Sequence, residues 1–221
     1  MNNFFKVVIP VGLILLLLWV LVPAPQVAER MNDMPWQIEL FENGSSKALG
    51  IHLGQDSLED VMRLYGPPEG MALFAATADG KDMSLEAYFG TVRNGPLAAK
   101  LVLVLEASRE EMFAMGERAL TRKPGPSGAY QWLLAEPDKA LMQSRRIKSL
   151  TYIPLYGQLD EEFFKTRFGE PASRARVDEK VERWFYPDKG LSILIDQEGK
   201  EVLQYVMPRD FRLMEMNPDR R

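Results

Sequence analysis

The longest uninterrupted run of apolar residues lies close to the start of the chain, from Val7 to Val22. Lys6 precedes this run and Pro23-Ala24-Pro25 follows it. Counted from Phe4, about nineteen residues at roughly 1.5 Å rise each approach the thickness of the hydrocarbon core of a bilayer. The pattern therefore predicts a membrane-spanning helix within residues 1–25.

A cleaved signal peptide is the alternative interpretation of this segment. A cleavage site needs small residues at the −3 and −1 positions. Cleavage after Ala24 leaves Pro25 directly behind the broken bond, and cleavage after Ala28 places Gln26 at −3. Both sites are poor, which favours an uncleaved anchor.

The charges that flank the span predict its orientation. Lys6 and the α-amino group lie before it without an acidic residue, whereas Glu29, Arg30 and Asp33 follow it. By the positive-inside rule the N-terminus stays in the cytoplasm and the rest of the chain is exported. We expect a single-pass protein of a bacterial inner membrane with a periplasmic domain.

After a linker at 26–35, the apolar positions predict a first α+β lobe over 36–123. Residues 36–41 alternate between apolar and polar, which is typical of a half-buried strand. Asn43-Gly44 predicts a hairpin turn into a second strand over 47–53.

Two further strands are expected over 83–92 and 98–107, joined by a turn at 94–96. The second of them is apolar on both faces, which predicts a central place in the sheet.

Helix start and stop signals punctuate this lobe. Ser57 is the expected N-cap of a helix that ends at Gly66. Ser108 to Glu111 has the pattern of a capping box and opens a second helix. The residues expected on the inward side of this second helix are Met112, Phe113, Gly116 and Leu120.

Residues 124–128 form a break rich in proline and glycine, after which a second α+β lobe is expected over 129–207. Its predicted elements are strands over 130–134 and 147–153, a helix over 137–144, and a helix capped by Asp160 with Phe163, Phe164 and Phe168 on its apolar side. Three strands joined by short turns, over 181–186, 191–196 and 201–207, predict an antiparallel meander. A polar tail follows at 208–221.

The two lobes share a short motif at a shift of about 103 residues. The caps Ser57 and Asp160 coincide in it, and so do the glycines Gly66 and Gly169 that end the helices. Two interpretations stay open, a duplicated unit or two capped helices that look alike by chance.

The stretch from Leu53 to Val61, continued by Tyr65-Gly66-Pro67-Pro68, resembles the helical unit of the small lipoproteins of the outer-membrane barrel-assembly machinery. The doubled arrangement resembles the tandem-repeat β-lactamase inhibitor proteins. The chain is also similar to uncharacterised proteobacterial envelope proteins whose exported domain opens with a Pro-Trp-x-Ile strand. These resemblances imply an α+β scaffold that binds other proteins and performs no chemistry, although the chain lacks the lipidated cysteine.

Composition narrows the range of functions. The net charge of −4 does not provide the cationic surplus that nucleic acid or an anionic surface requires. The absence of cysteine excludes disulfides, thiolate metal sites and a cysteine nucleophile.

The single histidine, His52, is the one conventional base for a Ser–His–Asp arrangement. No nucleophile elbow accompanies it, and Ser45 and Ser46 belong to the predicted turn, so a surface or edge-strand role is favoured. A tetrahedral zinc site cannot be built from one histidine without cysteine.

Three pairs of acids could hydrolyse glycosidic bonds if two carboxylates faced each other across a cleft. The pairs are Glu59-Asp60, Glu110-Glu111 and Glu161-Glu162. All three lie in predicted first turns of helices, where negative charge suits the helix dipole, and a structural role is favoured.

Two other groups of side chains receive structural interpretations. Thioether copper ligands are conceivable at Met31/Met34 and Met214/Met216 but are too sparse, while Met62, Met112, Met115 and Met142 suit a core. The basic clusters Arg145-Arg146 with Lys148, and Arg220-Arg221, are interpreted as solvated surface.

The sequence thus predicts a membrane-anchored periplasmic module that binds another envelope protein and assists assembly or regulation of a complex. A hydrolase of envelope glycan or lipid, or a small-ligand or metal sensor, are the alternatives. No catalytic, cofactor-binding or metal-binding residue is assigned. Trp184, Phe185 and Tyr186 are considered as a binding surface, but burial is favoured for them.

Overall fold

A computed structural model describes residues 33–77, 80, 82–124, 130–157 and 159–212. The expected membrane-spanning segment lies outside these residues, as do Met31, Met214, Met216 and Arg220-Arg221. Within the described part of the chain, no helix has the length and apolar character needed to cross a bilayer.

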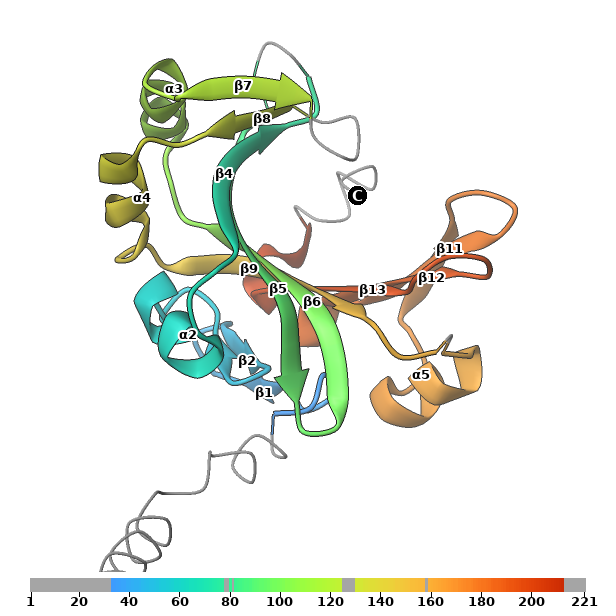
Figure 1. Cartoon of the computed structure of the whole chain (residues 1–221). Coiled ribbons are helices and arrows are strands. Elements are labelled where there is room, and N and C mark those ends of the chain that lie inside the picture. The colour runs from blue at the N-terminus through green and yellow to red at the C-terminus, as the bar shows by residue number, and fades with distance from the viewer. Residues whose placement is uncertain (1–32, 78–79, 81, 125–129, 158, 213–221) are drawn as a thin grey trace, which may run out of the picture.

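One large antiparallel sheet dominates the fold (Figure 1). Its ten strands follow the order β10-β11-β12-β13-β9-β6-β5-β4-β8-β7. In chain order they are β4 (Gly70–Ala75), β5 (Ser84–Asn94), β6 (Leu97–Leu105), β7 (Thr121–Pro124), β8 (Tyr130–Leu133), β9 (Ile147–Pro154), β10 (Ser173–Arg176), β11 (Val181–Tyr186), β12 (Leu191–Asp196) and β13 (Val202–Val206). The predicted antiparallel α+β class, the central place of β6 and the closing meander are confirmed.

The α-helices of the described chain all lie on one side of this sheet (Figure 1). They are α2 (Leu58–Tyr65), α3 (Arg109–Glu117), α4 (Glu136–Met142) and α5 (Glu161–Phe168). Along β6, Leu101 and Leu103 are fully buried, whereas the alternate residues Val102 and Val104 are only partly covered. The core therefore fills the space between the sheet and the helices.

A small three-stranded sheet lies beside the large one and corrects two predictions. Its strands are β1 (Glu39–Leu40), β2 (Ser46–Ala48) and β3 (Ile51–His52). The half-buried strand expected over 36–41 is wrong in extent and burial, because only Glu39 and Leu40 form a strand and both are exposed. The single strand expected over 47–53 is wrong, because Leu49 and Gly50 have φ angles of 55° and 75° and reverse the chain. Burial of Leu49 and a hydrogen bond from the Tyr65 hydroxyl to its carbonyl (2.7 Å) hold this conformation.

The helix caps follow the sequence signals, but one apolar face does not. Ser57, Ser108 and Asp160 each accept a hydrogen bond from the backbone N–H three residues on, as predicted. Of the residues expected on the inward side of α3, Met112 packs against the core, but Phe113 and Leu120 are 39% and 66% exposed, so the prediction is wrong for these two. The buried residue of this helix is Met115.

The motif shared by the two lobes has the same geometry in both copies. The φ and ψ angles are −86° and 166° at Ser57, and −84° and 168° at Asp160. They are 81° and −175° at Gly66, and 82° and −176° at Gly169. After α2 the chain forms β4, β5, β6 and β9, and after α5 it forms β10 to β13. In the sheet these two sets lie in mirrored order, with β9 paired to β13 at the centre.

An additional segment separates the third and fourth strands of the first set. It contains α3, β7, β8 and α4, and it extends the sheet beyond β4. The break predicted at 124–128 lies between β7 and β8, which pair with each other, so strands from both sides of that break share one sheet.

Candidate functional site

The face of the sheet opposite the helices is the candidate functional surface, and we call it the open face. In β6 it presents Val102 and Val104, which are half-buried, and the exposed Lys100. In β9 it presents Thr151 and Ile153, which lie opposite Val102 and Lys100. A sheet face with helices against it is buried, so half-exposed apolar side chains in the central strands indicate a face without such a layer.

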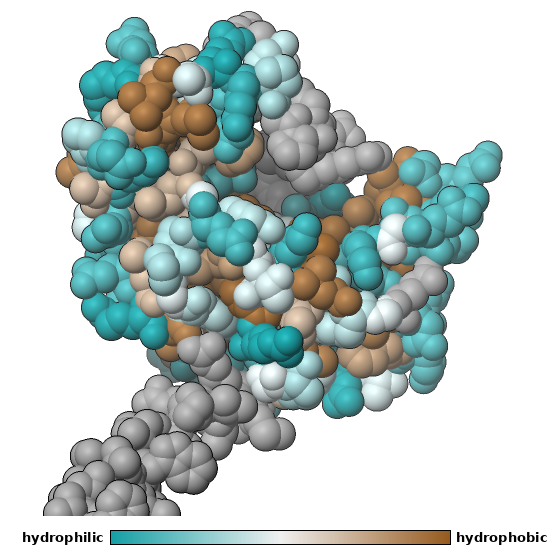
Figure 2. Space-filling model, in the orientation of Figure 1, coloured by the Kyte–Doolittle hydropathy of each residue, from teal (hydrophilic) through white to brown (hydrophobic). Residues whose placement is uncertain are grey.

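An apolar patch crosses the middle of the open face and is formed by Val102, Ile153, Leu194 and Val202. Val202 lies opposite Leu194 in the ladder between β13 and β12. All four side chains are partly exposed. Apolar surface is visible over the central strands in Figure 2, with hydrophilic surface around it. The apolar patch therefore draws on strands from both halves of the sheet.

Two cationic residues flank this apolar patch. The exposed Lys100 lies opposite Ile153, and Arg183 lies opposite Leu194. Arg183 is only 3% exposed, and its Nη1 donates to Gln204 Oε1 at 3.2 Å. Arg183 is therefore enclosed within the sheet, whereas Lys100 presents its charge to solvent. An acid, Glu86, lies opposite Val104 on the same face.

The aromatic run in β11 is buried, as favoured by the sequence analysis. Trp184 and Tyr186 point toward the helices, where Tyr186 packs on Phe168 at 6.1 Å between ring centroids. Burial raises the pKa of Tyr186 to about 12. Phe185 faces the open side, but Phe211 packs edge-on against it at 6.3 Å and both are at most 7% exposed. The run therefore contributes stability rather than a free binding surface.

The structure brings His52 and Ser45 together, but not in a catalytic arrangement. Ser45 Oγ lies 2.8 Å from His52 Nε2 and 2.6 Å from Asn43 Oδ1. Asn43 Oδ1 also accepts from the Ser45 backbone N–H at 3.0 Å. The serine hydroxyl therefore donates to Asn43, and its oxygen accepts from His52, so the imidazole acts as a donor instead of a base. Ser45 is 2% exposed and is closed to a substrate.

The acidic pairs have structural partners in the folded chain. Hydrogen bonds from Ser57 lower the pKa of Asp60, which also pairs with Arg63. Glu111 forms two hydrogen bonds with Arg145, at 2.7 and 2.9 Å, and this contact lowers its pKa to about 2. These carboxylates stabilise helix starts and a contact between elements, which supports the structural interpretation.

A groove beside the start of α5, with a volume of about 470 Å³, is also lined by acids with backbone partners. Asp160, Asp178 and Asp196 each accept a backbone N–H, at 2.8, 2.8 and 2.9 Å respectively. Among the described residues, no group of three or more potential ligands could hold a metal ion. The acids that line this groove therefore stabilise two turns and a helix cap at the solvent-exposed surface.

Two buried methionines and one basic cluster have structural roles in the folded chain. Met115 and Met142 belong to the core. Arg145 bonds Glu111, and Arg146 Nη1 donates to the Gly54 carbonyl at 3.4 Å. Neither feature adds a ligand-binding arrangement to the open face.

Comparison with protein-family models, curated proteins and solved structures finds no match to this chain. The resemblance to barrel-assembly lipoproteins and β-lactamase inhibitor proteins stays a prediction. The function is therefore inferred from the open face itself.

The sequence contained one signal for the open face that was interpreted too narrowly. The strand over 98–107 is apolar on both faces, which correctly indicated a central strand. It also implied that its second face needs an apolar neighbour. Where that neighbour is not part of the described chain, the same pattern indicates a binding surface.

Proposed function

We propose that this chain is a membrane-anchored periplasmic module that binds another envelope protein and assists assembly or regulation of an envelope complex. The apolar patch on the open face is the observation that carries the proposal. Partly exposed Val, Ile and Leu side chains from four neighbouring strands lose contact with water when a partner covers them, and this burial favours association.

The character of the surface favours a protein partner over a small ligand. Small-molecule sites are enclosed pockets, whereas protein interfaces combine an apolar centre with a polar rim. The apolar patch has Lys100 at one side and lies in an extended sheet rather than in an enclosed cavity. The structural partners of the acids around α5 likewise favour binding over carboxylate hydrolysis.

The partner is expected to present acidic side chains next to apolar ones. The exposed Lys100 lies at the edge of the apolar patch, and complementary charge sets the orientation of a bound surface.

Site-specific photo-crosslinking in living cells tests the proposal. A photoreactive residue at Val202 of the full chain is expected to give one discrete adduct, whereas one at Glu59 on α2 is expected to give none. Leu194→Asp places a charge in the apolar patch and should abolish the adduct. Leu141→Asp, at an exposed leucine of α4, is the matched control and should preserve it.

Two results would overturn the proposal. One is an adduct at Val202 that survives Leu194→Asp, because the contact would not then depend on the apolar patch. The other is the absence of any adduct from Val202, Ile153 and Val102 while the protein is present in the membrane fraction.

A further inference from the structure

The segment where the described chain begins is fixed firmly to the folded domain. Asn94 Nδ2, at the end of β5, donates to the Asp33 carbonyl at 3.1 Å. The buried Tyr205 hydroxyl donates to the Pro35 carbonyl at 2.8 Å. The start of the folded domain is therefore held at one defined place, next to the turn between β5 and β6.

An aromatic and cationic cluster lies directly beside this place. The Trp36 ring packs edge-on against Phe163 of α5, with 5.8 Å between centroids. The exposed Arg167 guanidinium lies over both rings, 4.5 Å from the Trp36 centroid and 5.8 Å from that of Phe163. Leu40, at the end of β1, and the next residue, Phe41, are 53% and 37% exposed. We call Trp36, Leu40, Phe41, Phe163 and Arg167 the proximal face.

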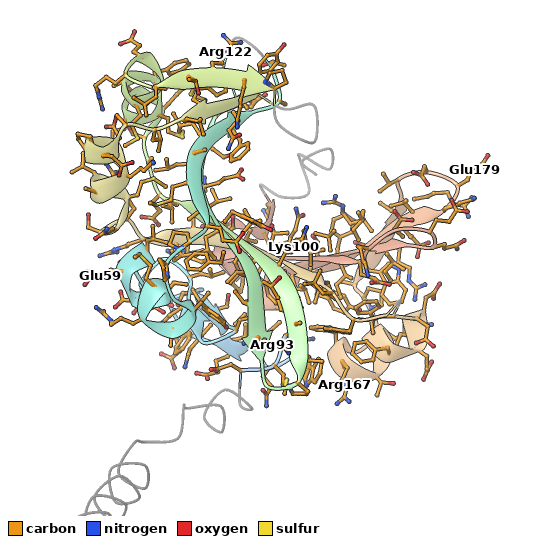
Figure 3. All side chains as sticks on the ribbon, in the orientation of Figure 1. Glu59, Arg93, Lys100, Arg122, Arg167 and Glu179 are labelled. Carbon is orange, nitrogen blue, oxygen red and sulfur yellow. The ribbon has the colours of Figure 1, made fainter. Side chains whose placement is uncertain are left out.

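A second arginine lies at the same end of the molecule. Arg93 is exposed and pairs with Ala98 across the β5–β6 hairpin, close to its turn. In Figure 3, Arg93 and Arg167 are labelled at the end of the domain where β1, the hairpin turn and α5 lie, whereas Arg122 and Glu179 lie far from it. The partly exposed rings of Trp36 and Phe163 thus lie near the start of the domain together with exposed aliphatic and arginine side chains, and the exposed Glu39 lies beside them.

The length of the linker places this face close to the predicted bilayer. Residues 26–32 separate the predicted anchor from Asp33. Seven residues reach at most about 25 Å when fully extended. Because Asp33 is fixed beside the proximal face, that face cannot move further than this from the membrane surface in an anchored chain.

The net charge of −4 gives the chain as a whole no cationic surplus, but the exposed Arg93 and Arg167 supply positive charge locally at this end. We propose that the proximal face docks through this local charge on the phosphate-bearing lipid head groups of the membrane that holds the anchor. Tryptophan rings favour the interface between head groups and hydrocarbon. Guanidinium groups bind phosphate through paired hydrogen bonds and keep their charge in partly apolar surroundings. The proposal rests on the anchor included in the proposed function, and it names the surface through which the anchored domain is oriented.

This orientation has a consequence for the open face. The residue Phe163 belongs to α5, which lies on the helix side of the sheet. Docking through α5 and β1 leaves the apolar patch on the opposite side of the sheet, exposed to the periplasm.

The absence of native cysteine allows single labels to test this docking. Thr166→Cys places a nitroxide on the exposed side of α5 next to Arg167, and Glu179→Cys places one far from the proximal face. The full chain is reconstituted in vesicles of phosphatidylcholine and phosphatidylglycerol that contain a nickel-chelating lipid. We expect collisions with head-group nickel to be several-fold more frequent for the label at 166 than for that at 179.

A charge reversal separates docking from simple tethering. Arg167→Glu in the Thr166→Cys chain should lower the collision frequency toward that of the label at 179. Arg122→Glu, at a distant arginine, should leave it unchanged. The nickel measurement on the chain with native Arg167 does not depend on the stability of either variant.

The outcomes distinguish this inference from the proposed function. If the chain floats with the vesicles and the labels at 166 and 179 collide equally, docking is wrong while the anchor stands. If the chain does not float with vesicles at all, the anchor is wrong and the docking proposal is overturned with it.

Discussion

The two halves of the large sheet have the same plan but different additions. Each begins with a capped helix, α2 or α5, and continues through four antiparallel strands that meet at β9 and β13. Between its third and fourth strands the first half contains α3, β7, β8 and α4, whereas β12 leads directly into β13 in the second half. We call the two repeated sets of one helix and four strands the first unit and the second unit.

The addition changes the outer edge of the first unit but not the centre of the sheet. At the edge strand β10, Arg174 lies over Trp184 at 4.1 Å and pairs with Glu161, Glu170 and Glu182. At the edge strand β7, Arg122 lies over the rings of two residues of β8. The apolar patch lies where the two units meet, so neither unit alone forms the proposed binding surface.

The largest expected difference between the units is the loss of stability when the buried side chain of each capped helix is truncated. Phe164 and Val61 both follow their caps by four residues and are fully buried. Phe164→Ala is expected to lower the free energy of unfolding by about 3–5 kcal/mol. Val61→Ala removes two methyl groups and is expected to cost about 2 kcal/mol.

Urea denaturation of the full chain in detergent micelles, followed by tryptophan fluorescence, measures both effects. Because Phe164 and Val61 belong to one core, each variant should shift a single transition. Two separate transitions, each moved by only one variant, would show that the units unfold independently.

The glycines that end α2 and α5 are expected to respond equally. Gly66 and Gly169 have φ near +80° with extended ψ, a conformation that is essentially restricted to glycine. Nothing lies within 4 Å of a Cβ added at either, so alanine there introduces backbone strain alone, of about 1–3 kcal/mol.

Chemical denaturation of Gly66→Ala and Gly169→Ala tests this equality. Gly70→Ala is the matched control, because a Cβ at Gly70 also meets nothing within 4 Å and its φ is not positive. A large loss of stability at one helix end with none at the other would contradict the equivalence of the two units.

The two N-caps should make smaller and comparable contributions. Ser57→Ala and Asp160→Ala each remove one side-chain acceptor for a helix N–H and are expected to cost about 1 kcal/mol. Asp160→Asn preserves an acceptor and is the control in the same denaturation assay. Equal losses for Asp160→Asn and Asp160→Ala would show that charge, not hydrogen bonding, is the source of the effect.

The smallest expected effect is a pH dependence of the free energy of unfolding, which arises from Glu111 in the additional segment of the first unit. Hydrogen bonds from Arg145 lower the pKa of Glu111 from 4.5 to about 2. The stabilisation is therefore complete above pH 4.5 and is lost as the pH falls toward 2, because protonation removes the ion pair. In Glu111→Gln this part of the acid dependence should disappear.

Denaturation of the native chain and of Glu111→Gln, compared at several values between pH 5 and pH 2, measures this contribution. Glu110→Gln is the neighbouring control and should keep most of the dependence. A native chain and a Glu111→Gln chain that lose stability in parallel throughout this range would exclude the contact with Arg145 as its cause.

Local signals predicted the helices of this protein well. Ser57, Ser108 and Asp160 each cap a helix by accepting a hydrogen bond from the backbone N–H three residues on. This bond is local, so it forms without a partner from a distant part of the chain. The strands over 181–186, 191–196 and 201–207 were predicted for a similar reason, since the short turns between them are also local signals.

Strands at the edges and in irregular places were not predicted. All four residues of β7, and all four of β10, are exposed, so these strands carry no alternation that a pattern could detect. The inward side predicted for the second helix was wrong at Phe113 and Leu120, which face solvent at the surface of the additional segment, although Met112 packs against the core. In these cases the neighbours decide burial, and the neighbours are distant in the chain.

Local chemistry along the chain sets the helix caps, the glycine stops and the α+β class, because each depends on residues a few positions apart, while the anchor expected near its start stays a prediction. The mirrored order of the two units, the hydrogen bond between Ser45 and His52, and the apolar patch arise from pairings between distant strands. Such pairings depend on which faces pack together once the whole chain is folded, and a local period carries no information about them.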